Sequence, residues 1–99
     1  MDREIEIIEK TIEILKKYFS PSKIILFGSR AQGKHYRHAD FDFAIDIKKP
    51  SITLQRELHE AIDKISGLYK IDIVYLLSVE EEFKNIILQT GKILYENKT

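Results

Sequence analysis

The chain lacks residues and patterns that would point to several classes of protein. It contains no cysteine, which excludes disulfide bonds and thiolate metal sites and is consistent with a cytoplasmic location. Its 16 Lys and Arg residues are balanced by 16 Asp and Glu residues. The overall positive field that nucleic-acid-binding proteins typically carry is therefore absent, and we expect no direct binding to nucleic acid.

Long hydrophobic runs are also missing. No stretch approaches the roughly 20 consecutive apolar residues that a membrane-spanning helix needs. The chain begins Met-Asp-Arg-Glu-Ile-Glu, with acidic residues where a signal peptide carries positive charge. We therefore expect a cytoplasmic protein without membrane association. Its 99 residues predict a single domain, residues 1–99, too small to include a separate acceptor-binding domain.

Hydrophobic periodicity predicts three helices and at least three strands. Apolar residues at helical spacing predict helices over about 3–19, 51–66 and 78–91. Apolar or alternating runs predict strands over 23–27, 40–47 and 71–77, followed by a short edge strand or docked tail at 93–95. The first helix is expected to bury a stripe formed by Ile5, Ile8, Ile12, Leu15 and Phe19. The third is expected to start with a capping box of Ser78 and Glu81 and to bury Val79, Phe83, Ile86 and Ile87.

These elements predict an α/β (α+β) fold with a mixed sheet of three to four strands and helices packed on it. The strand–helix–strand unit over 40–77 should form a right-handed parallel crossover. The short connection between Phe27 and Asp40 favours antiparallel pairing of the first two strands. This topology brings Gly28, Ser29, Asp40, Asp42 and Asp72 to one end of the sheet.

Two of these acidic residues have the spacing of a metal site. Asp40 and Asp42 stand two residues apart on a strand, so their side chains point the same way about 6–7 Å apart. Asp72 is the only charged residue in an otherwise apolar strand, where a buried charge needs a partner or a metal. Carboxylate oxygens are ligands that Mg²⁺ prefers, and one or two ions could bind here.

The segment Gly28-Ser-Arg-Ala-Gln-Gly33 has the composition of a phosphate-binding turn. Gly28 lets the backbone approach phosphate oxygens, and Ser29 adds a hydroxyl beside the N–H groups of the turn. Gly33 is expected to close the turn. Arg30 has two interpretations that the sequence leaves open, a bidentate contact to phosphate or a structural salt bridge.

Gly28-Ser29, followed at this spacing by Asp40-x-Asp42, resembles the signature of the polymerase-beta-like nucleotidyltransferases. Phe27-Gly-Ser-Arg-Ala-Gln-Gly33 is similar to the minimal nucleotidyltransferases (MNT), and the likeness extends over nearly the whole chain. The resemblance implies transfer of AMP from ATP with Mg²⁺. It implies Asp40, Asp42 and Asp72 as catalytic residues and metal ligands, and Gly28, Ser29, Arg30 and Gly33 as the nucleotide-binding turn. Asp72 would also orient or deprotonate the acceptor hydroxyl.

The resemblance also implies a partner. Many minimal members pair with a small helical HEPN protein as antitoxin and toxin, and some modify a tyrosine of that partner with AMP. Two residues depart from the family pattern: Ala39 replaces a Ser or Thr, and Gln32 replaces a basic residue. They motivate one alternative, an antitoxin that acts by binding alone. A second alternative is a small-molecule nucleotidyltransferase with an acceptor cleft formed in a homodimer.

Three further features are interpreted as structural. His35 and His38 make a poor zinc site without cysteine, and Lys34, His35, Arg37 and His38 are expected to form a solvated loop that could steer ATP or an acidic partner. Asp46 is expected to be solvated. Val74 and Leu76 would mark a docking surface if no helix covered them, and belong to the core otherwise.

Overall fold

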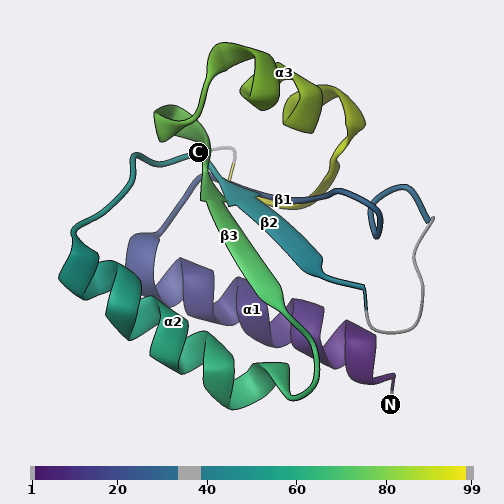
Figure 1. Ribbon diagram of the computed structural model, residues 1–99, viewed down its shortest axis with the longest axis vertical. Coiled ribbons are helices and arrows are strands. Elements are labelled where there is room, and N and C mark those ends of the chain that lie inside the picture. Colours follow the sequence, from purple (N-terminus) through teal and green to yellow (C-terminus); the bar gives the residue numbers. More distant parts are fainter. Residues whose placement is uncertain (1, 34–38, 98–99) are drawn as a thin grey trace.

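The computed structural model, described over residues 2–33 and 39–97, contains one mixed sheet and three α-helices (Figure 1). Its strands lie in the order β3-β2-β1-β4. The elements in chain order are α1 (Arg3–Phe19), β1 (Lys23–Phe27), β2 (Phe41–Ile45), α2 (Ile52–Ser66), β3 (Ile71–Tyr75), the short 3-10 helix η1 (Leu76–Ser78), α3 (Glu81–Thr90) and β4 (Lys92–Glu96). The basic loop and both of its histidines lie outside the described residues.

Strand pairing agrees with the topology expected from the sequence. β1 pairs antiparallel with β2, and β2 pairs parallel with β3 through the crossover helix α2. β4 pairs antiparallel with β1, so the C-terminal strand forms one edge of the sheet and β3 forms the other. The fold class predicted from the sequence is thus confirmed, with four strands. No helix in the described part of the chain is long and apolar enough to cross a membrane.

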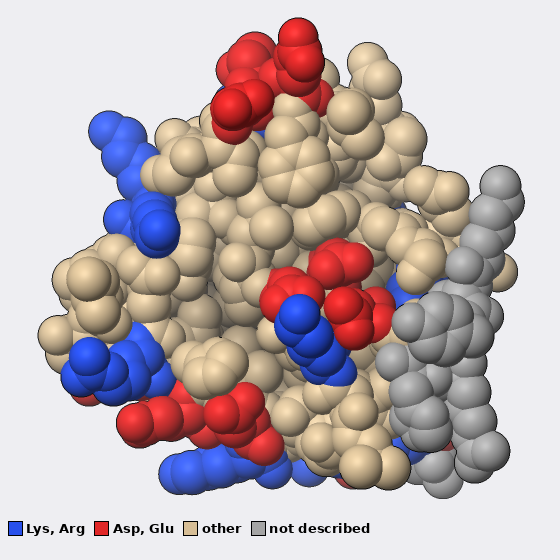
Figure 2. All heavy atoms as spheres, in the orientation of Figure 1, with Lys and Arg blue, Asp and Glu red and all other residues tan. Residues whose placement is uncertain are grey.

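The two faces of the sheet are covered unequally. α1 and α2 pack against one face, whereas α3 lies over part of the other (Figure 1). Ile25, Ala44, Leu76 and Ile87 are buried together beneath α3, and Val74 packs against them. Val74 and Leu76 therefore belong to the core and do not form a docking surface. Acidic side chains gather on the part of this face that α3 leaves open (Figure 2).

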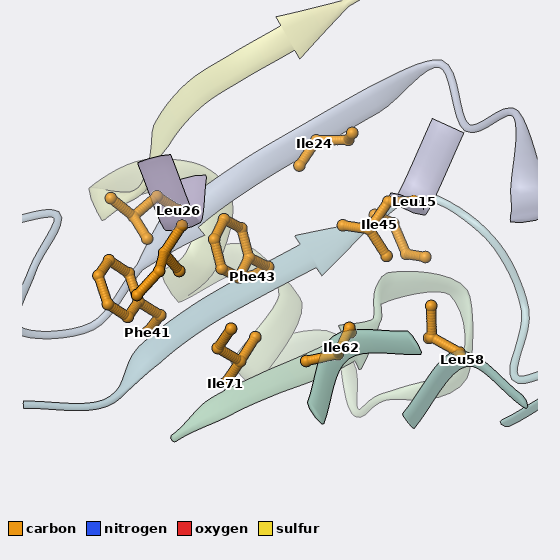
Figure 3. Packing of buried hydrophobic residues seen from close by; sticks show 10 residues of the cluster. Leu15, Ile24, Leu26, Phe41, Phe43, Ile45, Leu58, Ile62 and Ile71 are labelled. Carbon is orange, nitrogen blue, oxygen red and sulfur yellow. The ribbon is translucent and has the colours of Figure 1, made fainter. Parts of the chain in front are cut away.

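The main hydrophobic core lies between the sheet and the helices α1 and α2. In β2, Phe41, Phe43 and Ile45 all point to this side because side chains alternate along a strand (Figure 3). They meet Leu58 and Ile62 from α2. The alternation leaves Asp42 and Ala44 on the opposite face, where the candidate site lies.

Helix α1 buries part of the predicted stripe together with two residues that were not predicted. Ile7, Thr11 and Leu15 are fully buried, whereas Ile5 is 50% exposed. Ile8, Ile12 and Phe19 flank the core as expected. Leu15 is buried as predicted, whereas Ile7 and Thr11 were missed, Thr11 because it is polar.

The capping box predicted for the third helix is also wrong. Glu80 occupies the N-cap of α3 without a side-chain hydrogen bond, and the Ser78 hydroxyl accepts a hydrogen bond from the Lys49 backbone N–H at 2.8 Å. Ile87 is buried as expected, but Phe83 and Ile86 are exposed. The helix starts later than predicted because η1 takes up residues that the periodicity had assigned to strand and cap.

Two isoleucines of α2 provide a matched test of this core. Ile62 is buried, whereas Ile52 at the start of the same helix is 74% exposed. Ile62→Ala should lower the free energy of unfolding by about 2–5 kcal/mol, because it leaves a cavity beneath β2. Ile52→Ala should change it by less than about 0.5 kcal/mol. Urea denaturation followed by circular dichroism measures both, and equal losses would contradict this packing.

Candidate active site

The acidic residues predicted to act together lie at the N-terminal ends of β2 and β3. Asp42 and Asp72 are Cα partners in this parallel pair, so their side chains leave the same face of the sheet. Asp40 precedes β2, two residues before Asp42. Figure 2 shows acidic side chains gathered at this place with a basic side chain against them. The structure thus places the three acidic residues that the sequence singled out at the same end of two neighbouring strands.

Gly28 lies directly beneath the carboxylate of Asp42. β1 ends at Phe27, which is the Cα partner of Asp42, and the chain turns at Gly28 with a φ of +77°. A Cβ atom added to Gly28 would lie 2.5 Å from Oδ2 of Asp42. Glycine is therefore required both for the backbone conformation and for the close approach of the carboxylate.

The residues after Gly28 form a turn and no helix. The Gly33 N–H donates to the Arg30 carbonyl at 3.4 Å, and Gly33 has a φ of +70°, which suits its predicted role of closing the turn. Ser29 is exposed at the start of the turn, beside Gly28. The backbone N–H groups and the Ser29 hydroxyl are the groups that this turn can offer to an anion.

Arg30 points into the protein. Its side chain is 3% exposed, its Nε donates to the Ala39 carbonyl at 2.9 Å, and Nη1 pairs with the Glu4 carboxylate. The guanidinium lies 3.8 Å from the ring centroid of Phe41 and 5.4 Å from that of Tyr69. These contacts tie the turn to α1 and to the residues before β2 and β3. They are the contacts expected if Arg30 has a structural role. A contact between Arg30 and phosphate stays a prediction.

The electrostatics of the site centre on Asp42. Burial raises the pKa of Asp42 above its ordinary value of 3.8, and the charges of Asp72 and then Asp40 raise it further, whereas Lys70 lowers it. A carboxyl group that is partly desolvated between two other carboxyl groups favours either a proton or a cation.

The three carboxylates suit a hard divalent cation. They offer only oxygen ligands, and a cation between them would relieve the repulsion that raises the pKa of Asp42. As the side chains stand, no group of three or more potential ligands within residues 2–33 and 39–97 is gathered tightly enough to hold an ion. The Asp72 carboxylate lies 3.9 Å from the Lys70 ammonium. Asp40, Asp42 and Asp72 fit the expected metal in the chemistry of their oxygen ligands.

Several contributors were not identified from the sequence. Glu4 and Tyr69 support Arg30, and Lys70 lies against Asp72. The sequence held one signal for the contact between Lys70 and Asp72, because Lys70 immediately precedes the strand that carries Asp72. Asp46 was expected to be solvated, but its carboxylate accepts hydrogen bonds from the Ser22 hydroxyl and from the Lys23 backbone N–H.

Comparison with known proteins identifies the family. Residues 9–99 match the family described as polymerase beta, nucleotidyltransferase. The chain belongs to this family. It is therefore a nucleotidyltransferase, and its mixed sheet with packed helices is the polymerase-beta-like nucleotidyltransferase fold.

Relatives of this nucleotidyltransferase carry related names. It is 33% identical to "Putative protein adenylyltransferase MJ1379" of Methanocaldococcus jannaschii over 81 residues, covering 79% of this chain and 80% of the relative. It is 31% identical to the protein adenylyltransferase MntA of Aphanizomenon flos-aquae over 102 residues, covering 92% of this chain and 67% of the relative. A chain in a crystal structure of a toxin-antitoxin with AMP-PNP superposes with a TM-score of 0.77 at 25% identity, covering 91% of this chain and 73% of that one.

The two glycines of the turn allow a controlled test of the site. Both have positive φ, so Gly28→Ala and Gly33→Ala should each lower the free energy of unfolding by about 1–2 kcal/mol. Only the Cβ at position 28 collides with Asp42, because no described residue has an atom within 4 Å of a Cβ at position 33. Gly28→Ala should therefore raise the dissociation constant of Mn²⁺–ATP at least about tenfold more than Gly33→Ala does, which corresponds to about 1.4 kcal/mol of binding free energy. Calorimetry measures both constants. Equal binding by the two variants would contradict the placement of Asp42 over Gly28.

The raised pKa of Asp42 makes a prediction for stability. Without metal, ionised Asp42 costs stability above its folded-state pKa, and this cost disappears as the pH falls below its ordinary value of 3.8. Asp42→Asn should therefore raise the free energy of unfolding at pH 7 and lose this advantage below that value. Asp46→Asn should have the opposite effect at pH 7, because Asp46 accepts two hydrogen bonds. Urea titrations in chelator at several pH values make the comparison, and a destabilised Asp42→Asn at neutral pH would count against it.

Proposed function

We propose that this nucleotidyltransferase transfers AMP from ATP, with Mg²⁺, to a tyrosine hydroxyl of a HEPN-type toxin and so acts as its antitoxin. The observation that carries the proposal is the pairing of Asp42 and Asp72 on neighbouring strands beside Gly28. The relatives named protein adenylyltransferase and the similar chain in a toxin-antitoxin with AMP-PNP support the choice of adenylyl group and partner.

Each site residue has a distinct task in this proposal. The backbone at Gly28, the Ser29 hydroxyl and the N–H groups up to Gly33 bind the triphosphate oxygens. Asp40, Asp42 and Asp72 would hold the metal. Magnesium, when bound, offsets phosphate charge and acidifies a coordinated hydroxyl. Arg30 acts from behind the turn, where its contacts fix the position of the phosphate-binding backbone.

The transfer exchanges one bond for another. The acceptor hydroxyl oxygen attacks the α-phosphorus of ATP, and a new oxygen–phosphorus bond forms. The bond between the α-phosphorus and the oxygen that bridges to the β-phosphate breaks, so pyrophosphate leaves with the electron pair. The Asp72 carboxylate, which is 42% exposed at the edge strand, orients the acceptor hydroxyl and accepts its proton.

Contact-only neutralisation is the second candidate. It is favoured by Ala39, which is buried and offers no hydroxyl near the acidic residues, and by Gln32, which is exposed in the turn where a basic residue is common. The two candidates make opposite predictions for the carboxylate variants, because neutralisation by contact alone does not depend on the metal ligands.

Co-expression with a HEPN-type protein of the same genome tests the proposal. Intact-mass spectrometry should show the partner heavier by one AMP unit, and peptide sequencing should place the addition on a tyrosine. Asp42→Asn and Asp72→Asn should each lower the modified fraction at least about a hundredfold, as expected for lost metal ligands. Asp63→Asn, which removes an exposed carboxylate from α2, is the matched control and should leave the modification unchanged.

The outcomes separate the candidates. An unmodified partner that is nevertheless neutralised, equally well by Asp42→Asn, would establish the contact-only function. An unmodified partner together with no calorimetric binding of Mg²⁺–ATP would reject nucleotidyl transfer by this chain. Modification of a small alcohol in place of the partner would favour the small-molecule alternative.

A further inference from the structure

Lys70 is held at the mouth of the carboxylate site by the backbone. It immediately precedes β3, and its carbonyl accepts a hydrogen bond from the Phe41 N–H at 2.9 Å. Because Phe41 and Ile71 are Cα partners, Lys70 lies beside Asp40, where both strands begin. Its side chain is 69% exposed, so the ammonium can move while the backbone stays fixed.

The ammonium lies where a cation stabilises the acidic residues. Its Nζ is 3.9 Å from Oδ2 of Asp72, and its charge also lowers the pKa of Asp42. The same carboxylates are the ones expected to hold the metal. The ammonium and a divalent cation repel each other, so both cannot lie against the same oxygens without loss of binding energy.

We propose that Lys70 is an internal counterion that competes with the divalent cation for Asp72 and Asp42, and so makes metal binding depend on the nucleotide. This inference rests on the proposed function and adds a regulatory element to it. It assigns to Lys70 a role that neither the three carboxylates nor the turn can perform, because Lys70 supplies a mobile positive charge.

The dependence on nucleotide follows from the flexibility of the lysine side chain. A metal ion that arrives alone must displace the ammonium, which then loses its anionic partner. A metal ion that arrives with a triphosphate brings new anionic oxygens with it, and the four-carbon stem lets the ammonium turn to them. Metal and nucleotide therefore strengthen each other's binding, and by thermodynamic linkage the effect is reciprocal.

Direct metal binding tests this role without any measurement of activity. Mn²⁺ serves as the probe, with free Mn²⁺ measured by electron paramagnetic resonance. Lys70→Met should bind Mn²⁺ alone about two- to fivefold more tightly than the wild type, the range expected for an exposed ion pair. Its affinity for Mn²⁺–AMP-PNP, measured by calorimetry, should be equal or weaker. Lys70→Arg keeps the charge and should resemble the wild type in binding Mn²⁺ alone.

Lys17→Met is the matched control. Lys17 lies in the last turn of α1, exposed and on the helix layer behind the sheet, so its loss removes the same charge far from the carboxylates. Unchanged or weaker Mn²⁺ binding by Lys70→Met, or an equal gain in Lys17→Met, would overturn the inference and leave the proposed function intact. A wild-type chain that binds neither Mn²⁺ nor Mn²⁺–AMP-PNP would reject the proposed function, and the inference with it.

Discussion

Asp42 stands where two strand pairings meet, and the site depends on that position. Its Cα partner in β1 is Phe27, the last residue before the turn, and its partner in β3 is Asp72. The antiparallel pairing brings Gly28 beneath its carboxylate, and the parallel pairing sets the second acidic residue beside it. Helix α2 is needed as the crossover that makes β3 parallel to β2. The helices and the sheet therefore fix one carboxylate between the turn at Gly28 and a second carboxylate.

The same strand also carries much of the hydrophobic core. Phe41, Phe43 and Ile45 fill the space beneath α1 and α2, and Asp42 alternates with them on the opposite face. This arrangement places a partly desolvated charge on the same strand as fully buried core residues. The packing supplies the stability that offsets the repulsion between Asp42 and its acidic neighbours, so the chemistry on one face depends on the core on the other.

Sequence reasoning succeeded where local pattern determines position. The alternation around Asp42 predicted which face of β2 it lies on, and the short connection after Phe27 and the crossover over 40–77 predicted the two pairing directions. It failed where a distant residue decides the outcome. Ser78 resembles a helix cap, but its hydroxyl is taken by the Lys49 backbone, which is far away in the sequence. The sequence could not decide between a phosphate contact and a structural salt bridge for Arg30, because Glu4 and Tyr69 become its neighbours only after folding.

Arg30 is the one ionised side chain that is buried among the residues the structure describes. Its ion pair with Glu4 connects the turn over residues 28–33 to the first turn of α1. If the start of that helix frays, a buried guanidinium loses its counter-charge, and separating such a pair is costly. The beginning of the chain and the turn should therefore loosen together as one cooperative unit. A molecule that binds or releases the start of α1 would then tighten or loosen the turn without touching the open face of the sheet.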